Sequence, residues 1–572
     1  MRWKSACILA GISALAVGKA SALDFDNGTI QGNVISNVTA GLGMRTKDPS
    51  CSLIGVPDAY GCGANVNTDE WANGDNGNMN YKQNQLFTGY LSLTSELLLK
   101  MPSEGLKFLA RGTAFADPMA QRTQTTPLAG DARAQMDYRG KILDLWLQKD
   151  LTIDDQAAHF RLGNQVINWG ESIFAIGGIN ATNAVDVQTL LTPGTQLKQA
   201  LLPAPMLSFA SSLPAGFSTE AYYQFQWMGN TYPAVGSYWS MSNNYGRGAI
   251  PFYSNPNNFN VGGLPDPSTA YPYTNKLPGN KPQYGLKFAY SPPGAEVNFG
   301  AYYESYTDKS PVMSSIDGGL AGQYSYQKNR DMFGLSMNFP LGLWAIASEF
   351  SYRPRDAVSM SSCYLAGGPP DLNTNAAAGN CNQFMDNKRY QFTLNALLAM
   401  TPSSHPMVKW LGADQALFTA EVSMIDYPGI DSNKQYTSTI DGQAVYQLPA
   451  AGSNAWLNYN SGLGYPIGAG QGTARSAGYT LDFNWTYDGT VLPGWGVTPG
   501  VTFSNAFSGY TPNFTANYAR GAKSANFYVL LVQNPATWQA GINFTVFYGG
   551  NSSYAQPYAD RNFLGMYATR NF

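Results

Sequence analysis

The stretch RLGNQVINWGESIFAIGGIN, residues 161 to 180, places Trp169, Gly170 and Glu171 side by side. A buried glutamate in such a setting could act as a general acid or base, because burial brings a carboxyl pKa closer to neutrality. At the lip of a wide pore the same carboxylate would be solvated and ordinary. The chemistry of Glu171 therefore depends on the elements that position it.

Partners for such chemistry are few, because the chain has only two histidines. His159 occupies one of the alternate, polar positions of an expected strand, and His405 lies in a short connection beside two prolines. A hydrolase triad needs a histidine next to a nucleophile, and we find no G-x-S-x-G elbow or other serine signature. An enzyme is therefore the least favoured function.

Metal chemistry has one weak candidate, the acid-rich stretch NTDEWANGDNGNMN at 67 to 80, with Asp69, Glu70 and Asp75. It could resemble a calcium loop but lacks the terminal glutamate of an EF-hand, so a polar outside loop is the better interpretation. No C-x-x-C spacing supports a four-cysteine metal site. The sequence predicts neither a metal nor a cofactor.

The N-terminus reads as a signal peptide over residues 1–22, followed by one domain over 23–572. Arg2 and Lys4 form a basic start, residues 5–18 an apolar core, and Ala20-Ser21-Ala22 a cleavage site. Cys7 leaves with this peptide, and four cysteines remain in two close pairs. In an oxidising compartment, the plainest of three connectivities joins Cys51 to Cys62 and Cys363 to Cys381.

Composition narrows the class of protein. Charged residues are only 12% of the chain and the net charge is -3, so a nucleic-acid partner is not indicated. No run of 18 apolar residues follows the signal peptide, which leaves no transmembrane helix. Segments such as FSTEAYYQFQW at 217–227, QYGLKFAY at 283–290 and AGYTLDFNWTY at 477–487 instead alternate large apolar with smaller or polar residues, which predicts strands.

The connections between these segments alternate in length. Short ones, such as PAG at 214 and NPAT at 534, take turns with long ones, such as 229–279, 354–386 and 426–473. Outer-membrane barrels have short periplasmic turns and long outside loops, and lipid forces their sheets to close. We therefore predict an all-β protein, one closed antiparallel transmembrane barrel of about 18 strands, with 16 as the alternative and both ends periplasmic. The expected strands are 28–45, 86–101, 105–116, 137–149, 156–170, 205–213, 216–228, 282–291, 295–306, 329–339, 342–353, 387–400, 413–425, 474–488, 494–507, 522–533, 536–548 and 560–572.

Aromatic residues at strand ends suit the two interfacial girdles of such a barrel; they are Tyr223, Trp227, Tyr284, Tyr290, Trp485 and Tyr487. The terminal Phe572 resembles the signal read by the barrel-assembly machinery, although Arg570 departs from the apolar residue usual at that position.

The alternate strand positions that carry polar residues would line the lumen with charges of both signs, so neither an anion pore nor a cation pore is indicated. These charges are Glu96, Asp144, Glu220, Glu296, Glu304, Glu349, Glu421, Asp482, Arg111, Arg161, Lys287, Arg353 and Arg389.

Several separated motifs carry a family resemblance: LIG at 53, NGDNGNMNY at 73, SEL at 95, RLGNQVINWGESIFAIGGINATNAVDV at 161 and PGTQLKQALLPAPM at 193. Together they resemble the proteobacterial family catalogued as domain of unknown function 1302. The resemblance implies an outer-membrane barrel that works with a periplasmic lipid-carrier-like protein and an exporter of the resistance-nodulation-division type. Asn164, where relatives tend to have arginine, and the pair Cys51 and Cys62 depart from the family pattern.

The predicted function is an outer-membrane conduit for hydrophobic or amphiphilic, lipid-like cargo. The alternative is a solute-selective or general porin, and an enzyme or a structural barrel is less favoured. Outer-membrane lipid surrounds the barrel in either case.

The segment 171–204 has too many apolar residues for a free outside loop, so we expect it to fold inward and narrow the lumen. Buried charge needs partners, so Glu171 and Asp186 should face basic residues, with Arg161 the nearest in sequence. The predicted lumen and constriction residues are Arg161, Gln165, Trp169, Glu171, Asp186, Glu220 and Gln224.

Overall fold

The computed structural model describes residues 23–55, 59–63, 74–253, 270–369, 375, 377–452, 457–460, 465–468, 471–550 and 555–572. The predicted signal peptide lies outside these ranges, as do Asp69 and Glu70 of the acid-rich stretch. Within the described ranges, no helix is long and apolar enough to cross a bilayer.

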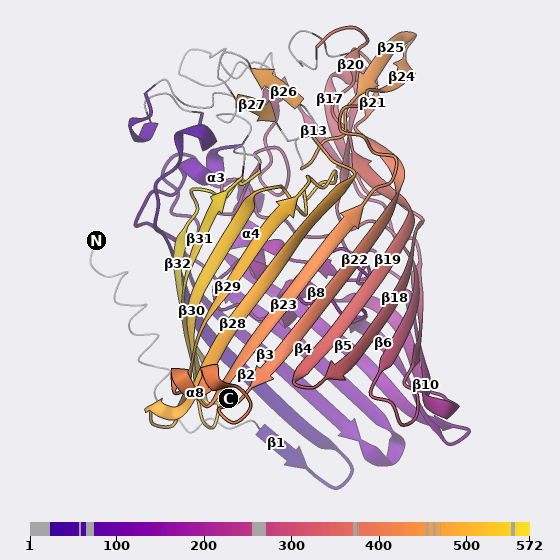
Figure 1. Cartoon of the computed structure of the whole chain (residues 1–572), viewed down its shortest axis with the longest axis vertical. Helices are drawn as coiled ribbons and strands as arrows, with labels where there is room; N and C mark the ends of the chain where they lie inside the picture. Colours follow the sequence, from indigo (N-terminus) through magenta and orange to yellow (C-terminus); the bar gives the residue numbers. More distant parts are fainter. Residues whose placement is uncertain are drawn as a thin grey trace.

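One antiparallel sheet curls into a closed barrel whose strands lean steeply across the wall (Figure 1). The sheet has 19 strands, of which 18 build the wall, as predicted, and the short β1 (Leu23–Asp26) pairs only with the start of β2. The wall strands are β2 (Gln31–Arg45), β3 (Leu86–Met101), β4 (Leu106–Ala116), β5 (Tyr138–Ile153), β6 (Gln156–Gln165), β9 (Ala204–Ser212), β10 (Phe217–Gln224), β14 (Gln283–Tyr290), β15 (Asn298–Tyr306), β18 (Arg330–Leu341), β19 (Trp344–Ser359), β22 (Phe384–Met400), β23 (Gln415–Asp426), β28 (Arg475–Leu492), β29 (Trp495–Ser508), β30 (Ala522–Gln533), β31 (Trp538–Gly549) and β32 (Phe563–Asn571).

Pairing of the first and last wall strands closes the barrel. The register between β2 and β32 runs from Asn37 opposite Asn571 to Arg45 opposite Phe563. Inside the barrel, the Thr39 and Thr569 hydroxyls are 2.8 Å apart across this seam. Closure is physically required because an open edge in hydrocarbon would leave backbone groups without hydrogen-bond partners.

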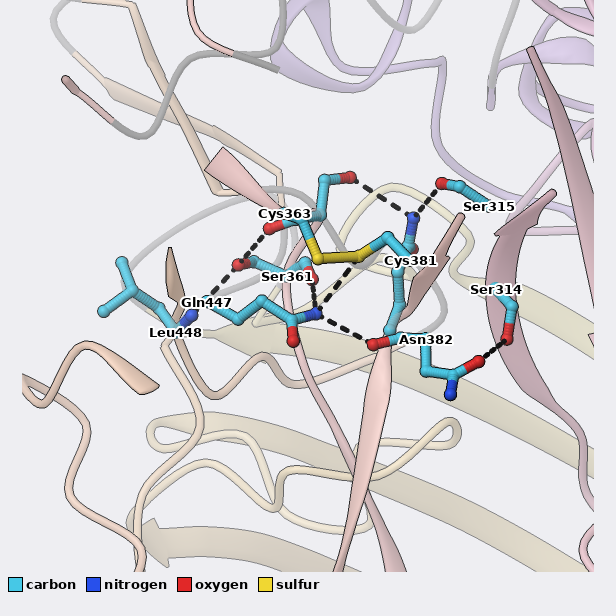
Figure 2. The surroundings of a disulfide bond; sticks show 10 residues. Ser314, Ser315, Ser361, Cys363, Cys381, Asn382, Gln447 and Leu448 are labelled. Atoms are coloured by element: carbon cyan, nitrogen blue, oxygen red, sulfur yellow. Dashed lines mark hydrogen bonds between the residues drawn. A yellow bond between two sulfur atoms is a disulfide. The ribbon is translucent and has the colours of Figure 1, made fainter. Parts of the chain in front are cut away.

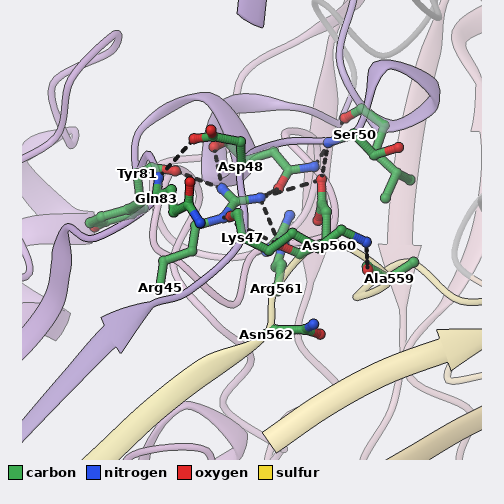
Figure 3. Close-up of polar contacts among 12 residues, drawn as sticks. Arg45, Lys47, Asp48, Ser50, Tyr81, Gln83, Ala559, Asp560, Arg561 and Asn562 are labelled. Atoms are coloured by element: carbon green, nitrogen blue, oxygen red, sulfur yellow. Dashed lines mark hydrogen bonds and ion pairs between the residues drawn. The ribbon is translucent and has the colours of Figure 1, made fainter.

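A buried arginine clamps the outer end of the seam (Figure 3). Arg45 ends β2 and is fully buried, and its Nη2 lies 3.3 Å from the carboxylate of Asp560, just before β32. The same guanidinium donates to the carbonyls of Asn78 at 2.8 Å and Tyr81 at 2.6 Å. Because a buried arginine must satisfy several donors at once, this cluster joins the two ends of the wall to the connection between β2 and β3.

Side-chain alternation produces the two faces of the wall. On β3, Leu91 and Leu93 are 51% and 44% exposed on the lipid side, whereas Ser92 and Thr94 are buried on the inner side. Successive side chains of a strand point to opposite faces, so the period of two in the sequence becomes an apolar outside and a polar inside.

The connections have the predicted asymmetry, and the C-terminus lies at the end with the short turns (Figure 1). Most short turns have only a few residues, such as 154–155 and 342–343, and the longest, 401–414, carries α8 (Pro406–Leu411). The long loops at the other end hold small accessory sheets and helices. These are α3 (Asn76–Met79), α4 (Gly130–Met136), β11 (Phe252–Tyr253), β12 (Ala270–Tyr271), β13 (Tyr273–Lys276), β16 (Val312–Ile316), β17 (Ala321–Ser325), β20 (Tyr364–Leu365), β21 (Cys381–Asn382), β24 (Tyr436–Ile440), β25 (Gln443–Gln447), β26 (Leu457–Asn460) and β27 (Tyr465–Gly468).

Both predicted disulfides are present, and both lie in long outside loops. The Sγ atoms of Cys51 and Cys62 are 2.04 Å apart, and those of Cys363 and Cys381 are 2.03 Å apart. Around the second bond, the Gln447 side-chain amide donates to the carbonyls of Ser361 at 2.8 Å and Asn382 at 2.9 Å (Figure 2). The disulfide thus closes the loop between β19 and β22 on itself, and the Gln447 hydrogen bonds tie this loop to the β24–β25 hairpin.

Three expectations about strand limits are wrong. The strand predicted over 156–170 ends at Gln165, because the chain leaves the wall there. Glu296 was expected in the lumen but lies exposed in the turn before β15, which begins at Asn298. Trp227 was expected in an aromatic girdle, but β10 ends at Gln224 and the Trp227 indole donates to the Asp308 carbonyl at 3.2 Å.

Candidate functional site in the barrel lumen

The connection between β6 and β9, residues 166–203, runs through the inside of the barrel; we call it the inward segment. Its two ends are neighbours, since Gln165 pairs with Ala204 in adjacent strands. A tight turn could join these strands, yet the chain between them contacts inward-facing residues on distant parts of the wall. The inward segment therefore narrows the lumen, as its apolar content predicted.

Two wall carboxylates hold the first half of the inward segment. Glu349 on β19 accepts the backbone amides of Glu171 at 2.7 Å and Ser172 at 3.2 Å. Glu421 on β23 accepts those of Ile173 at 2.6 Å and Phe174 at 2.9 Å. Charged acceptors make strong hydrogen bonds to N–H groups, so these two glutamates fix a backbone that has no strand neighbours of its own.

Donors from the same side of the barrel bind the carbonyls of this half. Arg353 donates to Gly178 at 2.7 Å, Gln391 to Ile176 at 3.2 Å, and Asn395 to Glu171 at 2.7 Å. The fit is close. A Cβ on Gly178 would lie 1.8 Å from the Glu349 carboxylate, so only glycine allows this approach.

The side chain of Glu171 points to β18, where its Oε1 accepts from Asn338 at 3.0 Å and Ser336 at 3.3 Å. The expected pairing with Arg161 is wrong. Arg161 stays on the β6 wall, stacked 4.2 Å over the Trp146 ring and donating to Gln148 at 2.8 Å. Because β6 ends at Gln165, the chain has crossed to another part of the wall before it reaches Glu171.

Trp169 is buried where the segment leaves β6. Its ring packs 5.3 Å from Tyr222 and 5.9 Å from Tyr302, and its Nε1 donates to Glu220 at 2.8 Å. Lys287 also binds Glu220 at 2.8 Å. The tryptophan side chain is thus packed and hydrogen-bonded against the inner wall.

The remaining predicted lumen residues lie on the wall beside it. The Gln165 amide donates to the Met206 carbonyl at 3.1 Å, and its oxygen accepts from Ser208 at 2.8 Å. The Gln224 amide donates to the Gln226 carbonyl at 2.6 Å. Gln165 and Gln224 are therefore fixed wall residues.

The second half of the inward segment packs on the wall near the seam. It contains β7 (Ala184–Val185), α5 (Val187–Leu190), α6 (Leu197–Ala200) and β8 (Leu201–Leu202). The Tyr90 hydroxyl on β3 donates to the Pro193 carbonyl at 2.5 Å, and Gln199 donates to Thr94 at 2.7 Å. Asp186 caps α5 through the Thr189 amide at 2.9 Å and forms an ion pair with Lys141 on β5.

Apolar side chains of the inward segment remain exposed although they lie inside the barrel. Ile173, Phe174 and Ile176 are 49%, 39% and 62% exposed, and Leu190 and Leu197 are 50% and 61% exposed. The backbone amides of Ile173 and Phe174 bind the Glu421 carboxylate on the wall, while their side chains stay exposed toward the lumen. The lumen thus combines a polar wall with an apolar patch on the inward segment.

Some of the predicted wall charges form ion pairs, and others are bound by neutral hydrogen-bond donors. Arg111 lies 2.6 Å from Glu96 and 2.7 Å from Asp144. Asp482 accepts from the hydroxyls of Thr502 at 2.7 Å and Tyr528 at 3.0 Å. The sequence placed Glu349 and Glu421 among these lumen charges, but nothing in the strand pattern indicates that they anchor a segment from another strand.

The two histidines lie apart on the wall and in a short turn. His405 accepts the Met407 amide at 3.3 Å at the start of α8, and His159 lies opposite Asp150 on the wall. Among the described residues, neither imidazole forms a hydrogen bond with a serine, threonine or cysteine side chain, and no group of three or more His, Cys, Asp or Glu side chains could hold a metal ion. Asp75, from the acid-rich stretch, accepts the Gly55 amide at 2.9 Å.

Comparison with known proteins gives a family and a general architecture. A family model described as "Protein of unknown function (DUF1302)" matches residues 3–572. None of the curated proteins matches the sequence. With its apolar outer face and closed sheet, the chain is an outer-membrane barrel.

Solved structures with similar folds are distant in sequence. OccAB1 of Acinetobacter baumannii is 9% identical, with 95% of this chain and 96% of that chain covered and a TM-score of 0.43. OpdK of Pseudomonas aeruginosa, solved with vanillate, is 10% identical, with 94% and 98% covered and a TM-score of 0.42. OccD3 (OpdP) of Pseudomonas aeruginosa is 10% identical, with 97% and 94% covered and a TM-score of 0.40.

Proposed function

The chain belongs to the DUF1302 family, and from its lumen we propose that it is a solute-selective outer-membrane channel for small amphiphilic molecules. The observation that carries this proposal is the exposed apolar patch of Ile173, Phe174 and Ile176 in front of a polar wall. A solute with one apolar and one polar part can contact both surfaces at once. A fully hydrophilic solute gains nothing from the patch.

The size of the effect follows from the surface that a solute would cover. Removing apolar surface from water contributes roughly 25 cal/mol per Å². Covering about 60 Å² of the patch would therefore favour an amphiphilic solute by about 1.5 kcal/mol, or roughly tenfold. Such a contact is strong enough to select a solute and weak enough to release it, which conduction requires.

A conduit for larger lipids fits this lumen less well. Every wall strand is paired on both sides, so the described wall offers no lateral opening between strands. A lipid with two acyl chains would have to pass end to end along a polar wall. The periplasmic carrier and the inner-membrane exporter remain predictions, and they are compatible with either cargo.

Solute flux into proteoliposomes tests the proposal. The pair of solutes should match in size, one a medium-chain monocarboxylate and the other a sugar acid. The variant I173S/F174S/I176S should reduce flux of the monocarboxylate several-fold and leave flux of the sugar acid equal or higher. A matched control, I153S/L341S/L343S, removes three exposed apolar residues at the short-turn end of the barrel. An unchanged ratio of the two fluxes in the patch variant would refute the proposal.

A further inference from the structure

A cavity of about 630 Å³ opens on the outer surface of the barrel, away from the lumen, where β19 and β22 reach the outside loops. Its lining includes Arg355, Asn387, Lys388 and Tyr390, and the turn Pro428-Gly429 forms one rim. Neither the lumen nor the proposed channel uses this cavity.

A row of aromatic residues marks the membrane boundary beside it. Phe333, Tyr352 and Tyr390 are direct neighbours on adjacent strands, and their rings lie 6.3 and 4.9 Å apart. The row continues to Asp426 and Arg475, which form an ion pair at 3.3 Å. Aromatic girdles lie at the level of lipid headgroups, so the cavity opens where headgroups meet the protein.

An irregularity in the sheet turns one cation toward this cavity. The register between β19 and β22 shifts between Arg353 and Asp356, so that Pro354 and Arg355 together oppose the single residue Lys388 and β19 holds one extra residue. A bulge of this kind changes the direction of the side chains it contains. Arg353 is buried at the inner wall, whereas Arg355 is exposed and uses one donor to bind the Asn329 carbonyl at 2.6 Å.

The charges around the cavity leave a positive excess. Its one lining acid, Asp386, is bound by both terminal nitrogens of the buried Arg330, at 2.9 and 2.6 Å. Lys388 is exposed, and no described residue forms a hydrogen bond or ion pair with its ammonium group. Two cations and the Asn387 amide therefore line the cavity, and its one lining acid is already bound by Arg330.

We propose that this cavity binds the phosphate of a lipid headgroup in the outer leaflet. A phosphate can accept from the remaining Arg355 donors, the Lys388 ammonium and the Asn387 amide together. The exposed lipid face beside Tyr390 would take the start of an acyl chain. A free phosphate would contact only the polar lining of the cavity. A lipid would contact this lining with its phosphate and the lipid-facing wall beside Tyr390 with its acyl chain.

Binding to the detergent-solubilised full chain tests the proposal with four probes: a phosphorylated acyl disaccharide, its dephosphorylated form, phosphatidylglycerol and inorganic phosphate. The variant R355Q/K388Q should bind the phosphorylated acyl disaccharide at least roughly tenfold more weakly, a loss of about 1.4 kcal/mol. The control K276Q/K281Q removes two exposed cations from an outside loop and should bind as the unchanged protein does. Heat-modifiable migration on gels reports that both variants are folded.

Each outcome bears on the proposal. If R355Q/K388Q loses affinity equally for the acyl disaccharide and for phosphatidylglycerol, the site accepts any lipid phosphate. If it loses affinity for the acyl disaccharide alone, the site is specific for the glycolipid. Both results support the proposal. Unchanged affinity in R355Q/K388Q would overturn it. So would binding of inorganic phosphate as tight as that of the lipids, or equally tight binding of the dephosphorylated disaccharide.

Discussion

The carboxylate of Glu349 accepts the backbone amide of Glu171 at 2.7 Å, although 178 residues separate them in the chain. One residue belongs to the wall strand β19, and the other to a segment that leaves the wall after β6. The constriction is therefore held by acceptors on the wall and by peptide N–H groups of the segment. Its position depends on charge that the segment does not itself supply.

Neutralising the two anchors should loosen the constriction. We expect E349Q/E421Q to fold normally and to show larger and noisier single-channel conductance in planar bilayers. Each hydrogen bond to a charged group contributes about 1.5–3 kcal/mol, and a glutamine amide accepts more weakly. The control is E96Q, which removes an inward-facing glutamate that binds Arg111 and does not anchor the segment. Conductance identical to the unchanged protein would contradict the anchoring role.

Removing the inward segment should open the pore without unfolding the barrel. Gln165 and Ala204 are already paired neighbours, so a short turn can replace residues 171–200. We expect the deletion variant to insert, to keep its heat-modifiable migration and to conduct several times more current. If a correctly inserted deletion conducted no more current, the segment could not be the constriction.

The second half of the segment should respond to acid. Burial by itself would raise the pKa of Asp186. The opposite effect of Lys141, Arg139 and the Thr189 amide is larger, so the pKa lies below the ordinary 3.8. A carboxyl with a depressed pKa stabilises the docked segment above the ordinary value, and this stabilisation is lost as pH falls through the docked pKa. Conductance should stay constant from pH 7 down to about 4 and rise below it.

The variant D186N isolates this effect, because an asparagine does not titrate in this range. Its conductance should be higher than that of the unchanged protein at pH 7 and should rise less below pH 4. A D186N channel that still shows the full acid response would assign the response to another group.

The disulfide between Cys363 and Cys381 should stabilise the outside loops and leave the wall unchanged. In C363S/C381S the loop between β19 and β22 loses its link at β21, and limited proteolysis near residues 360–383 should become faster. Resistance of the wall strands should not change. The variant C51S/C62S is the matched comparison, since it should expose only the loop between β2 and β3. Peptide mapping without reductant that finds either pair free or crossed would refute the pairing.

Period-two alternation was enough to predict the wall. Each strand carries its own pattern of lipid-facing and inward-facing residues, and the expected strand near 522–533 has the same bounds in the structure. The errors fall at strand ends, where the pattern stops being informative. For Trp169 the alternation continues past Gln165 in the sequence, yet the chain has already left the sheet.

The sequence by itself determined a closed barrel of about 18 strands, the alternation of short turns with long outside loops and the plainest pairing of the four cysteines. These depend on local alternation, on spacing and on the rule that lipid leaves no edge unpaired. Only the tertiary structure decided that Glu349 and Glu421 bind the amides of residues 171–175, and that Arg161 does not meet Glu171. Contacts across a lumen join strands that are far apart in sequence. Their geometry depends on the barrel circumference and on the path of the inward segment, and neither is encoded in the alternation of any single strand.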